Sequence, residues 1–222
     1  MIFRSKLVNK YKERPCIKFY QLKDEIIINI RRVSGGILHI GAHKGVEAAL
    51  HDQLGVPVLW IEANPNLMKE LSANISRFKE HKAICALLGD ENRSDVPFHI
   101  ANNDGMSSSI FRFGKDMNHA NLAMNEEVLL SMKRLDSLFQ ANDLSIYGHW
   151  IIDVQGAELS VLQGAGALLD VAKSIEIEVS TKEEYLGGAT WTQVSSFLNE
   201  LNFFPLWSPE HYSHEDIVFV RY

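Results

Sequence analysis

The feature that most constrains the fold of this chain is a regular alternation, in its first half, between short apolar runs and amphipathic stretches. Three apolar runs lie at 37–40, 58–61 and 82–88. The segments between them carry apolar residues at the spacing of one helix face, as Leu67 and Leu71 do. Strands that alternate with helices in this way are typical of a mostly parallel sheet with helices on its faces. The sequence therefore predicts an α/β fold.

The second half of the chain continues this pattern and ends differently. Strands are predicted at 149–154 and 174–179, each followed by a helix, and an extra strand is expected at 96–101. The last two apolar runs, 203–207 and 217–222, predict an antiparallel hairpin at the edge of the sheet.

Charge is distributed unevenly along the 222 residues, although a content of 46% hydrophobic and 23% charged residues is ordinary for a globular protein. Residues 1–32 contain nine lysines and arginines and three acids, whereas the remainder is strongly acidic. An acidic body binds nucleic acid poorly, so we expect no nucleic-acid partner. We predict a basic arm at 1–36, with a short helix or strand inside it, and one domain at 37–222. The arm is expected to pack against its own acidic domain; contact with a phosphate, an anionic lipid or a partner is the alternative.

No segment of the sequence has the length and apolar character of a transmembrane helix, and the N-terminus lacks the apolar core of a secretory signal. The two cysteines, Cys16 and Cys85, are far apart in the sequence, which favours a reducing compartment. We therefore expect a cytoplasmic protein without a membrane span.

Glycines and acidic residues stand where the predicted strands end. Gly41 and Gly45 follow the first strand, Glu62 ends the second, and Asp153 ends a later one. The carboxyl ends of parallel strands meet at one edge, where open α/β sheets bind ligands. A carboxylate that follows the glycine loop by about 20 residues is placed to accept hydrogen bonds from both hydroxyls of a ribose. The sequence therefore predicts an adenosine-binding site at this edge.

The glycine loop argues against a nicotinamide or flavin dinucleotide as the ligand. Its pattern is Gly-x-x-x-Gly, not Gly-x-Gly-x-x-Gly, and His43 stands where the second glycine would let a pyrophosphate approach. The terminal hairpin is also foreign to the usual dinucleotide-binding half-sheets. Two other classes stay open as alternatives: a nucleotide-linked oxidoreductase, and a non-catalytic binding module on the same fold.

Several stretches of the chain resemble FkbM-type methyltransferases. The runs 37–45 and 60–65 resemble early motifs of that family. The strongest similarity lies at 152–165, which begins Ile-Asp-Val-Gln-Gly-Ala-Glu and matches the hallmark of the family. Residues 107–109 and 134–136 are similar to its central segments.

This resemblance, which covers roughly residues 37–205, implies a Rossmann-like class I methyltransferase fold whose sheet has seven strands, mostly parallel, and a C-terminal antiparallel hairpin. It implies S-adenosylmethionine as the methyl donor and a hydroxyl of a sugar or secondary metabolite as the acceptor. We expect a small-molecule or glycan acceptor and no metal. Two positions depart from the pattern: His39 stands where class I methyltransferases generally carry an acid, and Gln155 where many relatives carry glutamate.

The residues expected to bind the donor follow the strand ends and these motifs. They are His39, Gly41, Ala42, His43, Gly45, Glu62, Ala63, Asn64, Asp90 and Asp153. For Asp90 an ordinary turn is the alternative interpretation, and Asn64 also fits the start of a helix.

Asp153 is the main candidate for catalysis, because it emerges from a buried strand at the functional edge. It is expected to act as a base for the acceptor hydroxyl or to orient it, and capping of the next helix is the alternative. His43 is a second candidate base, with a structural hydrogen bond as the favoured interpretation. The residues expected to contact the acceptor are Ser107, Ser108, Glu158 and Glu178. A flexible loop is the alternative for the two serines, and Glu158 could instead hold the loop of Asp153 or lie on a solvated helix face.

The acceptor pocket is expected to be built by the loops at 102–125, 181–190 and 208–216. His211 and His214 in the last loop have a spacing that suggests metal ligands. No third group of ligands accompanies them in the sequence, so a metal site is not favoured.

Overall fold

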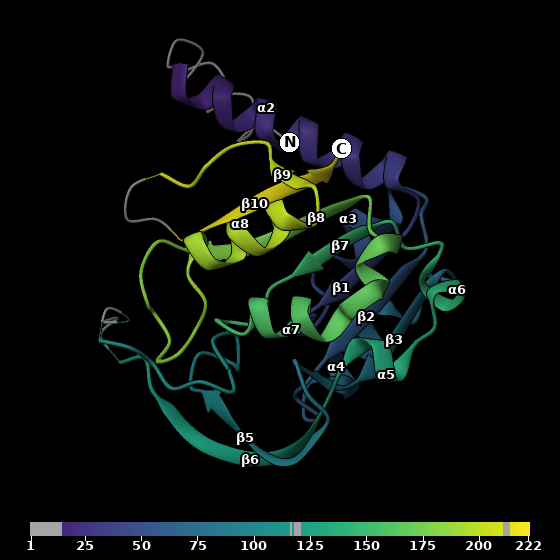
Figure 1. Ribbon diagram of the computed structural model, residues 1–222. Coiled ribbons are helices and arrows are strands. Elements are labelled where there is room, and N and C mark those ends of the chain that lie inside the picture. The colour runs from purple at the N-terminus through teal and green to yellow at the C-terminus, as the bar shows by residue number, and fades with distance from the viewer. Residues whose placement is uncertain (1–14, 116, 118–120, 211–213) are drawn as a thin grey trace, which may run out of the picture.

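The computed structural model describes residues 15–115, 117, 121–210 and 214–222. A seven-stranded sheet forms its centre, in the order β3-β2-β1-β7-β8-β10-β9 (Figure 1). The strands are β1 (Ile37–Ile40), β2 (Val58–Glu62), β3 (His81–Cys85), β7 (His149–Ile152), β8 (Ser174–Ser180), β9 (Phe203–Pro205) and β10 (His214–Arg221). Neighbouring strands are parallel except at β10, which runs antiparallel to both β8 and β9. The predicted parallel sheet with its antiparallel hairpin is confirmed.

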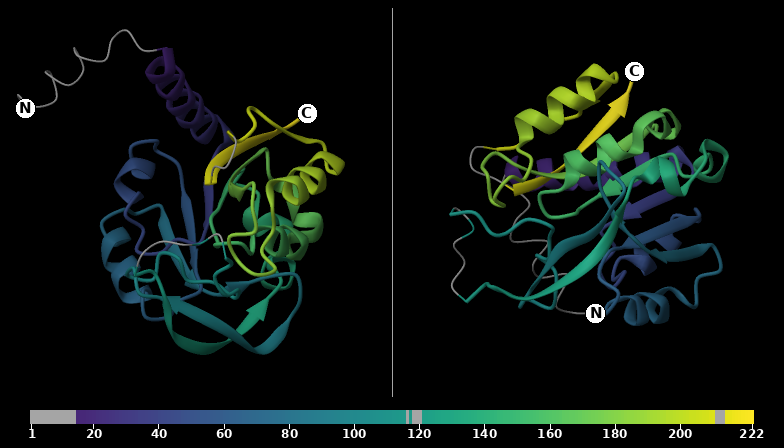
Figure 2. Two further views of the ribbon diagram at one scale, coloured as in Figure 1. Left: turned by 90° about the vertical axis from the view of Figure 1, so that its left-hand side faces the viewer. Right: turned by 60° about the horizontal axis from the view of Figure 1, so that its bottom comes forward.

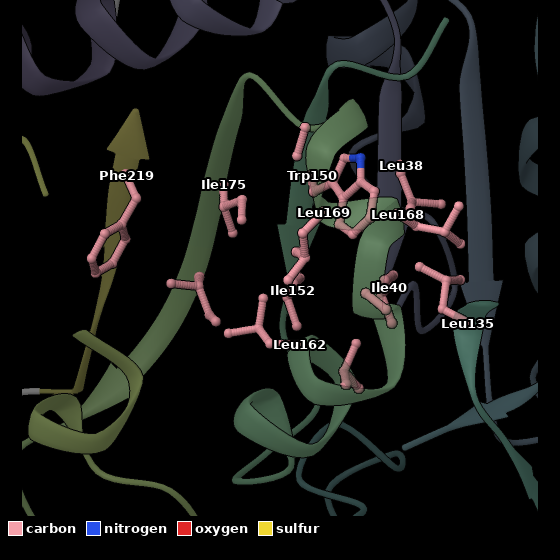
Figure 3. Close-up of a cluster of buried hydrophobic side chains, with 14 of the residues drawn as sticks. Leu38, Ile40, Leu135, Trp150, Ile152, Leu162, Leu168, Leu169, Ile175 and Phe219 are labelled. Atoms are coloured by element: carbon pink, nitrogen blue, oxygen red, sulfur yellow. The ribbon is translucent and has the colours of Figure 1, made fainter. Parts of the chain in front are cut away.

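Helices cover both faces of this sheet, which explains why its central strands are continuous apolar runs. Every residue of β1, β2 and β7 is buried, as expected for parallel strands enclosed on two sides. One core, drawn in Figure 3, includes Trp150 and Leu162. It lies under α5 (Leu135–Leu138), α6 (Ala141–Leu144), α7 (Glu158–Ala165), η1 (Gly166–Val171) and α8 (Trp191–Glu200). The other core is centred on Trp60 and lies under α3 (Ala48–Asp52) and α4 (Met68–Ile75).

A second, three-stranded sheet lies beside the main one as a separate curved layer (Figures 1 and 2). Its strands are β4 (Leu87–Leu88), β5 (Arg93–Ala101) and β6 (Met124–Lys133), with β6 in the middle. The extra strand expected at 96–101 is present as part of β5. The strand expected at 82–88 is instead divided, because β3 ends at Cys85 and β4 pairs with β6 in the second sheet. β6 itself was not predicted from the sequence, since Met132 is its one fully buried residue and its apolar alternation is weak.

The basic arm continues into a helix, α2 (Pro15–Ser34), which settles the choice between helix and strand in this segment. Lys23 forms an ion pair with Glu215 on β10, and Arg31 forms one with Glu176 on β8. These contacts agree with an arm that packs against its own acidic domain. Residues 1–14 lie outside the described residues, and the boundary between arm and domain at residue 36 stays a prediction.

In the part of the chain that the structure describes, no helix combines the length and apolar character needed to cross a bilayer.

Candidate functional site

A cavity of about 690 Å³ lies at the carboxyl ends of β1, β2 and β7, and Gly41, Glu62 and Asp153 line it together. Its second wall comes from the three-stranded sheet and the loop that follows β5, including Leu88, Phe98 and Ile110. A concave, mostly pre-formed space with apolar walls and a few polar groups is the usual form of a small-molecule site.

The glycine loop forms the floor of this cavity. The amides of Gly41 and Ala42 donate to the carbonyl oxygen of Ile61, at 2.9 and 3.0 Å, which fastens the loop to β2. Gly41 has a φ of +87°, and a Cβ atom there would lie 1.7 Å from the carbonyl oxygen of Asp153. Only glycine fits this approach of the loop to β7. Gly45 does not line the cavity; it packs against Leu71 of α4 and turns the chain toward α3.

His43 lines the cavity and connects its two sides. Its Nε2 lies 2.8 Å from the carbonyl oxygen of Asp104, and the neighbouring Lys44 forms an ion pair with the Asp104 carboxylate at 2.6 Å. The glycine loop is therefore tied to the loop at 102–109. This arrangement supplies the structural hydrogen bond that the sequence analysis favoured for His43.

Glu62 lies at the end of β2 with its carboxylate buried at the cavity wall. Its two oxygens accept hydrogen bonds from the backbone amides of His43 and Asn64, both at 2.7 Å. Burial raises the pKa of Glu62, while the two amides favour its charged form. Each carboxylate oxygen can accept a further hydrogen bond, so the group is oriented for a ligand with two adjacent hydroxyls.

Three other predicted donor residues occupy different surroundings. Ala63 lines the cavity, whereas Asn64 is buried behind it, and its side chain accepts from the amide of Asn66 at 3.0 Å. Asp90 is exposed and does not line the cavity; the hydroxyl of Ser160 on α7 donates to its carboxylate at 2.8 Å.

His39 lines the cavity at the end of β1, but its ring is stacked on Trp60, with centroids 4.8 Å apart. Burial lowers the pKa of His39 to about 3, so the imidazole is neutral. The end of β1 therefore presents an uncharged ring to the cavity.

Asp153 and Gln155 form the opposite, acidic end of the site. Asp153 lines the cavity, and its Oδ1 accepts a hydrogen bond from Gln155 Nε2 at 2.6 Å. The same nitrogen donates to Glu178 Oε2 at 2.7 Å, and Tyr185 Oη donates to Gln155 Oε1 at 2.5 Å. From the sequence, Gln155 was identified only as a departure from the family pattern.

Glu158 and Glu178, expected at the acceptor, lie behind Gln155 and do not line the cavity. Glu158 is buried and accepts from the backbone amides of Val154 and Gly156, at 3.1 and 3.0 Å. Burial and the nearby Asp153 raise the pKa of Glu158 to about 7. Its position therefore fits support of the turn after β7.

His214, the first residue of β10, pairs with Ser180 at the carboxyl end of β8 and lines the cavity. Its Nε2 lies 2.6 Å from Glu178 and its Nδ1 lies 2.8 Å from Glu184. These two carboxylates raise the pKa of His214 to about 10, so the ring is cationic at neutral pH. From the sequence, His214 was identified only as a disfavoured metal ligand, and Glu184 was not identified. His211 lies outside the described residues.

Ser107 and Ser108 both line the cavity, as expected for residues near the acceptor. The hydroxyl of Ser108 accepts from the amide of Ala101 at 3.1 Å, and that of Ser107 accepts from Asn103 at 2.9 Å. The apolar side chains beside them, Met106 and Leu122, were not identified from the sequence, although the loop at 102–125 that carries them was expected to build the pocket.

Three carboxylates of the acidic end, those of Asp153, Glu158 and Glu178, offer oxygens within 4.8 Å of one another. Backbone amides already bind Glu158, and the side-chain amide of Gln155 binds the other two. The expectation that the reaction needs no metal stays a prediction.

Comparison with known proteins gives one informative match. A sequence model of a family described as the methyltransferase FkbM domain matches residues 39–205, which include the glycine loop and the run after β7. This match confirms the family resemblance found in the motifs. Among curated proteins, no match to the chain was found.

Solved structures show more distant likenesses. Magnesium protoporphyrin IX methyltransferase from Synechocystis PCC 6803, solved with bound SAM, aligns with 93% of this chain and 81% of its own at 9% identity and a TM-score of 0.49. The PH0226 protein from Pyrococcus horikoshii OT3 aligns with 95% of this chain and 93% of its own at 10% identity and a TM-score of 0.49.

Proposed function

Because the chain belongs to the FkbM family of methyltransferases, we propose that it transfers the methyl group of S-adenosylmethionine to a hydroxyl of a small-molecule or glycan acceptor. The observation that carries this proposal is the cavity at the strand ends, which brings Glu62 and Asp153 into one site with the glycine loop. This is the edge at which open α/β sheets bind nucleotides.

The donor is held at the end formed by β1 and β2. Glu62 accepts hydrogen bonds from the two ribose hydroxyls, and Ala63 borders the adenosine together with the apolar residues Leu87 and Phe98. Gly41, Ala42 and His43 bring the loop backbone close to the remainder of the donor. The geometry does not favour a direct contact for Asp90, which is bound to α7 instead.

Methyl transfer is assigned to the end at Asp153. When bound, the donor supplies an electrophilic methyl group. Asp153 would accept the hydrogen bond of the acceptor hydroxyl and take its proton as the oxygen bonds to the methyl carbon. The bond from that carbon to sulfur would break, and S-adenosylhomocysteine would leave. Holding the reactants in line accounts for most of the acceleration, and a positioned base adds roughly 10²–10⁴-fold.

The charges around the cavity indicate which acceptors fit. Four carboxylates line it, whereas no lysine or arginine does among the residues that the structure describes. The cationic ring of His214 also lines the cavity, but it is already paired with Glu178 and Glu184. A phosphate or carboxylate on the acceptor would therefore find no unpaired counter-charge and would lose its hydration. Met106, Ile110 and Leu122 add apolar surface beside the hydroxyl-binding serines. An uncharged acceptor with polar and apolar faces, as a sugar ring has, fits this lining.

Calorimetric titration with S-adenosylmethionine, S-adenosylhomocysteine and NADH tests the donor site. We expect micromolar dissociation constants for the first two ligands and no binding of NADH. Binding of NADH alone would support a nucleotide-linked oxidoreductase and overturn the proposal. Binding of none of the three would support a non-catalytic module.

The role of Asp153 is tested without knowledge of the acceptor by sinefungin, a donor analogue that carries an amine at the position of the methyl group. A carboxylate facing that position favours the protonated amine, so we expect sinefungin to bind about tenfold more tightly than S-adenosylhomocysteine. Asp153→Asn should abolish this preference, and the control Asp52→Asn on α3 should retain it. An unchanged preference in Asp153→Asn would rule out this placement of the carboxylate.

A further inference from the structure

Gln155 has an unusual backbone conformation, and both polar atoms of its side chain form hydrogen bonds. Its φ is +57°, in the left-handed region that residues with a side chain rarely adopt. Its backbone carbonyl accepts from the hydroxyl of Ser109 at 2.7 Å, and the next residue, Gly156, packs directly against Tyr185. The loop after β5 and the loop at 181–190 therefore both meet at this residue. Backbone strain of this kind persists only where the surroundings determine it.

The side-chain amide of Gln155 joins two carboxylates that would otherwise repel each other. Its nitrogen is 2.6 Å from Asp153 Oδ1 and 2.7 Å from Glu178 Oε2. An amide nitrogen carries two hydrogens, so each carboxylate receives one. The amide oxygen accepts the hydroxyl of Tyr185. No polar atom of this side chain is left over, and its orientation is determined by three partners from three segments.

A glutamate at this position would not reproduce these contacts. A charged glutamate has no hydrogen to donate and adds a third negative charge between two others. A protonated glutamate donates a single hydrogen and satisfies one carboxylate only. Glutamate has a similar shape, but it cannot donate the two hydrogen bonds that the amide of Gln155 donates.

We propose that Gln155 is a positioning residue, whose amide binds Asp153 Oδ1 and Glu178 Oε2 together so that Asp153 Oδ2 is presented to the methyl group in the cavity. This inference rests on the proposed role of Asp153. In the part of the chain that the structure describes, Asp153 Oδ2 has no hydrogen-bond partner, which leaves it available to the acceptor hydroxyl. Glu178 is in turn held by His214, so the position of Asp153 depends on β8 and β10.

Nuclear magnetic resonance of the 15N-labelled full chain tests the double hydrogen bond. The side-chain amide signals of Gln155, identified by their loss in Gln155→Met, are expected downfield of those of exposed Gln163. Asp153→Asn should move one of the two proton signals and Glu178→Gln the other, and neither should move Gln163. Signals of Gln155 that coincide with those of Gln163 and respond to neither variant would overturn the proposal.

Donor analogues test the consequence for the site. We expect Gln155→Met and Gln155→Glu to lose the preference for sinefungin over S-adenosylhomocysteine, while their affinity for S-adenosylhomocysteine changes less than about threefold. Gln163→Glu on α7 is the matched control and should keep the preference. If Gln155→Met does not fold, Gln155→Asn, which withdraws the amide by one methylene, should show the same loss.

The outcomes separate this inference from the proposed function. If Asp153→Asn loses the preference and the Gln155 variants retain it, positioning by Gln155 is wrong and the role of Asp153 stands. If the wild-type chain binds neither analogue, the proposed function fails, and the magnetic resonance experiment still decides whether Gln155 joins the two carboxylates.

Discussion

Single residues of the glycine loop decide how closely β1 and β7 approach each other at the site. Gly41 and Gly55 both have positive φ, +87° and +70°, but only Gly41 faces another segment. An added Cβ at Gly41 would lie 1.7 Å from the carbonyl oxygen of Asp153, whereas one at Gly55 meets nothing within 4 Å. An alanine at Gly55 would therefore report backbone strain alone, whereas an alanine at Gly41 would report strain and a steric clash together.

We expect Gly55→Ala to lower the free energy of unfolding by about 1 kcal/mol, the cost of a left-handed alanine. Gly41→Ala should cost at least ~2 kcal/mol more, because Asp153 must move, and should weaken S-adenosylhomocysteine binding at least tenfold. Urea denaturation and calorimetry measure these changes. Equal effects of the two substitutions would contradict the close approach seen here.

Glu62 offers a second test at the same scale, because both of its oxygens accept backbone amides. In Glu62→Gln one of these amides faces an NH2 group, so the side chain turns away from the ribose. We expect S-adenosylhomocysteine to bind roughly 10–100-fold more weakly. Glu47, an exposed carboxylate that also lines the cavity, is the control, and Glu47→Gln should change affinity less than about threefold. Similar losses in both variants would indicate a general charge effect.

At the scale of elements, α2 is held to the sheet by a buried network of charges. Arg31 Nε donates to Glu176 Oε2 at 2.9 Å, and His149 Nε2 lies 3.1 Å from the same oxygen. His149 also contacts Ser174, whose hydroxyl lies 3.0 Å from that of Ser34. A hydrogen bond from His149 and the charge of Arg31 hold the pKa of Glu176 down to about 2, despite its burial.

Removing Arg31 leaves the Glu176 carboxylate buried without the cation that pairs with it. We expect Arg31→Met to lower the free energy of unfolding at pH 7 by about 3–5 kcal/mol. Arg32→Met, at the exposed neighbour, should change it by less than ~0.5 kcal/mol. A carboxylate with a lowered pKa contributes stability above its unfolded pKa that is lost as pH falls toward 2. The Arg31 effect should therefore shrink in acid, and an effect that stays constant with pH would exclude the charge network as its cause.

At the scale of the whole molecule, stability in acid depends on histidines that fold in the neutral form. His51 is fully buried, and neither of its ring nitrogens has a hydrogen-bond partner within the described part of the chain. Burial lowers the pKa of His51 to about 2 and that of His39 to about 3. Below pH ~6.5 these histidines are protonated in the unfolded chain but stay neutral in the folded chain. The free energy of unfolding therefore falls as pH falls. Glu158, whose pKa is raised to about 7, acts in the opposite direction.

His51→Phe isolates one of these groups from the others. Between pH 6.5 and 5 a single such histidine costs roughly 2 kcal/mol of stability. We expect the free energy of unfolding of the variant, relative to wild type, to be about 2 kcal/mol more favourable at pH 5 than at pH 8. Urea denaturation at the two pH values measures the difference. The same relative stability at both would show that His51 is not held neutral.

The sequence by itself determined the central sheet and one edge of the site. Short apolar runs separated by helical spacing are local patterns, and right-handed connections between parallel strands bring all their carboxyl ends to one edge. Gly41, Glu62 and Asp153 could therefore be assigned to one place from their positions along the chain. The family motifs added the methyl donor to that assignment.

Only the tertiary structure decided what closes the site and which acids face it. β6 has one buried residue and a weak alternation, so its pairing with β4 and β5 depends on segments distant in sequence. Glu178 lies near the end of β8 and Glu158 begins α7, yet both lie behind Gln155, while His214 and Glu184 line the cavity. Which way a side chain points after a strand ends depends on the turn and on its packing partners. The spacing of residues in the sequence predicts neither the turn nor the packing partners.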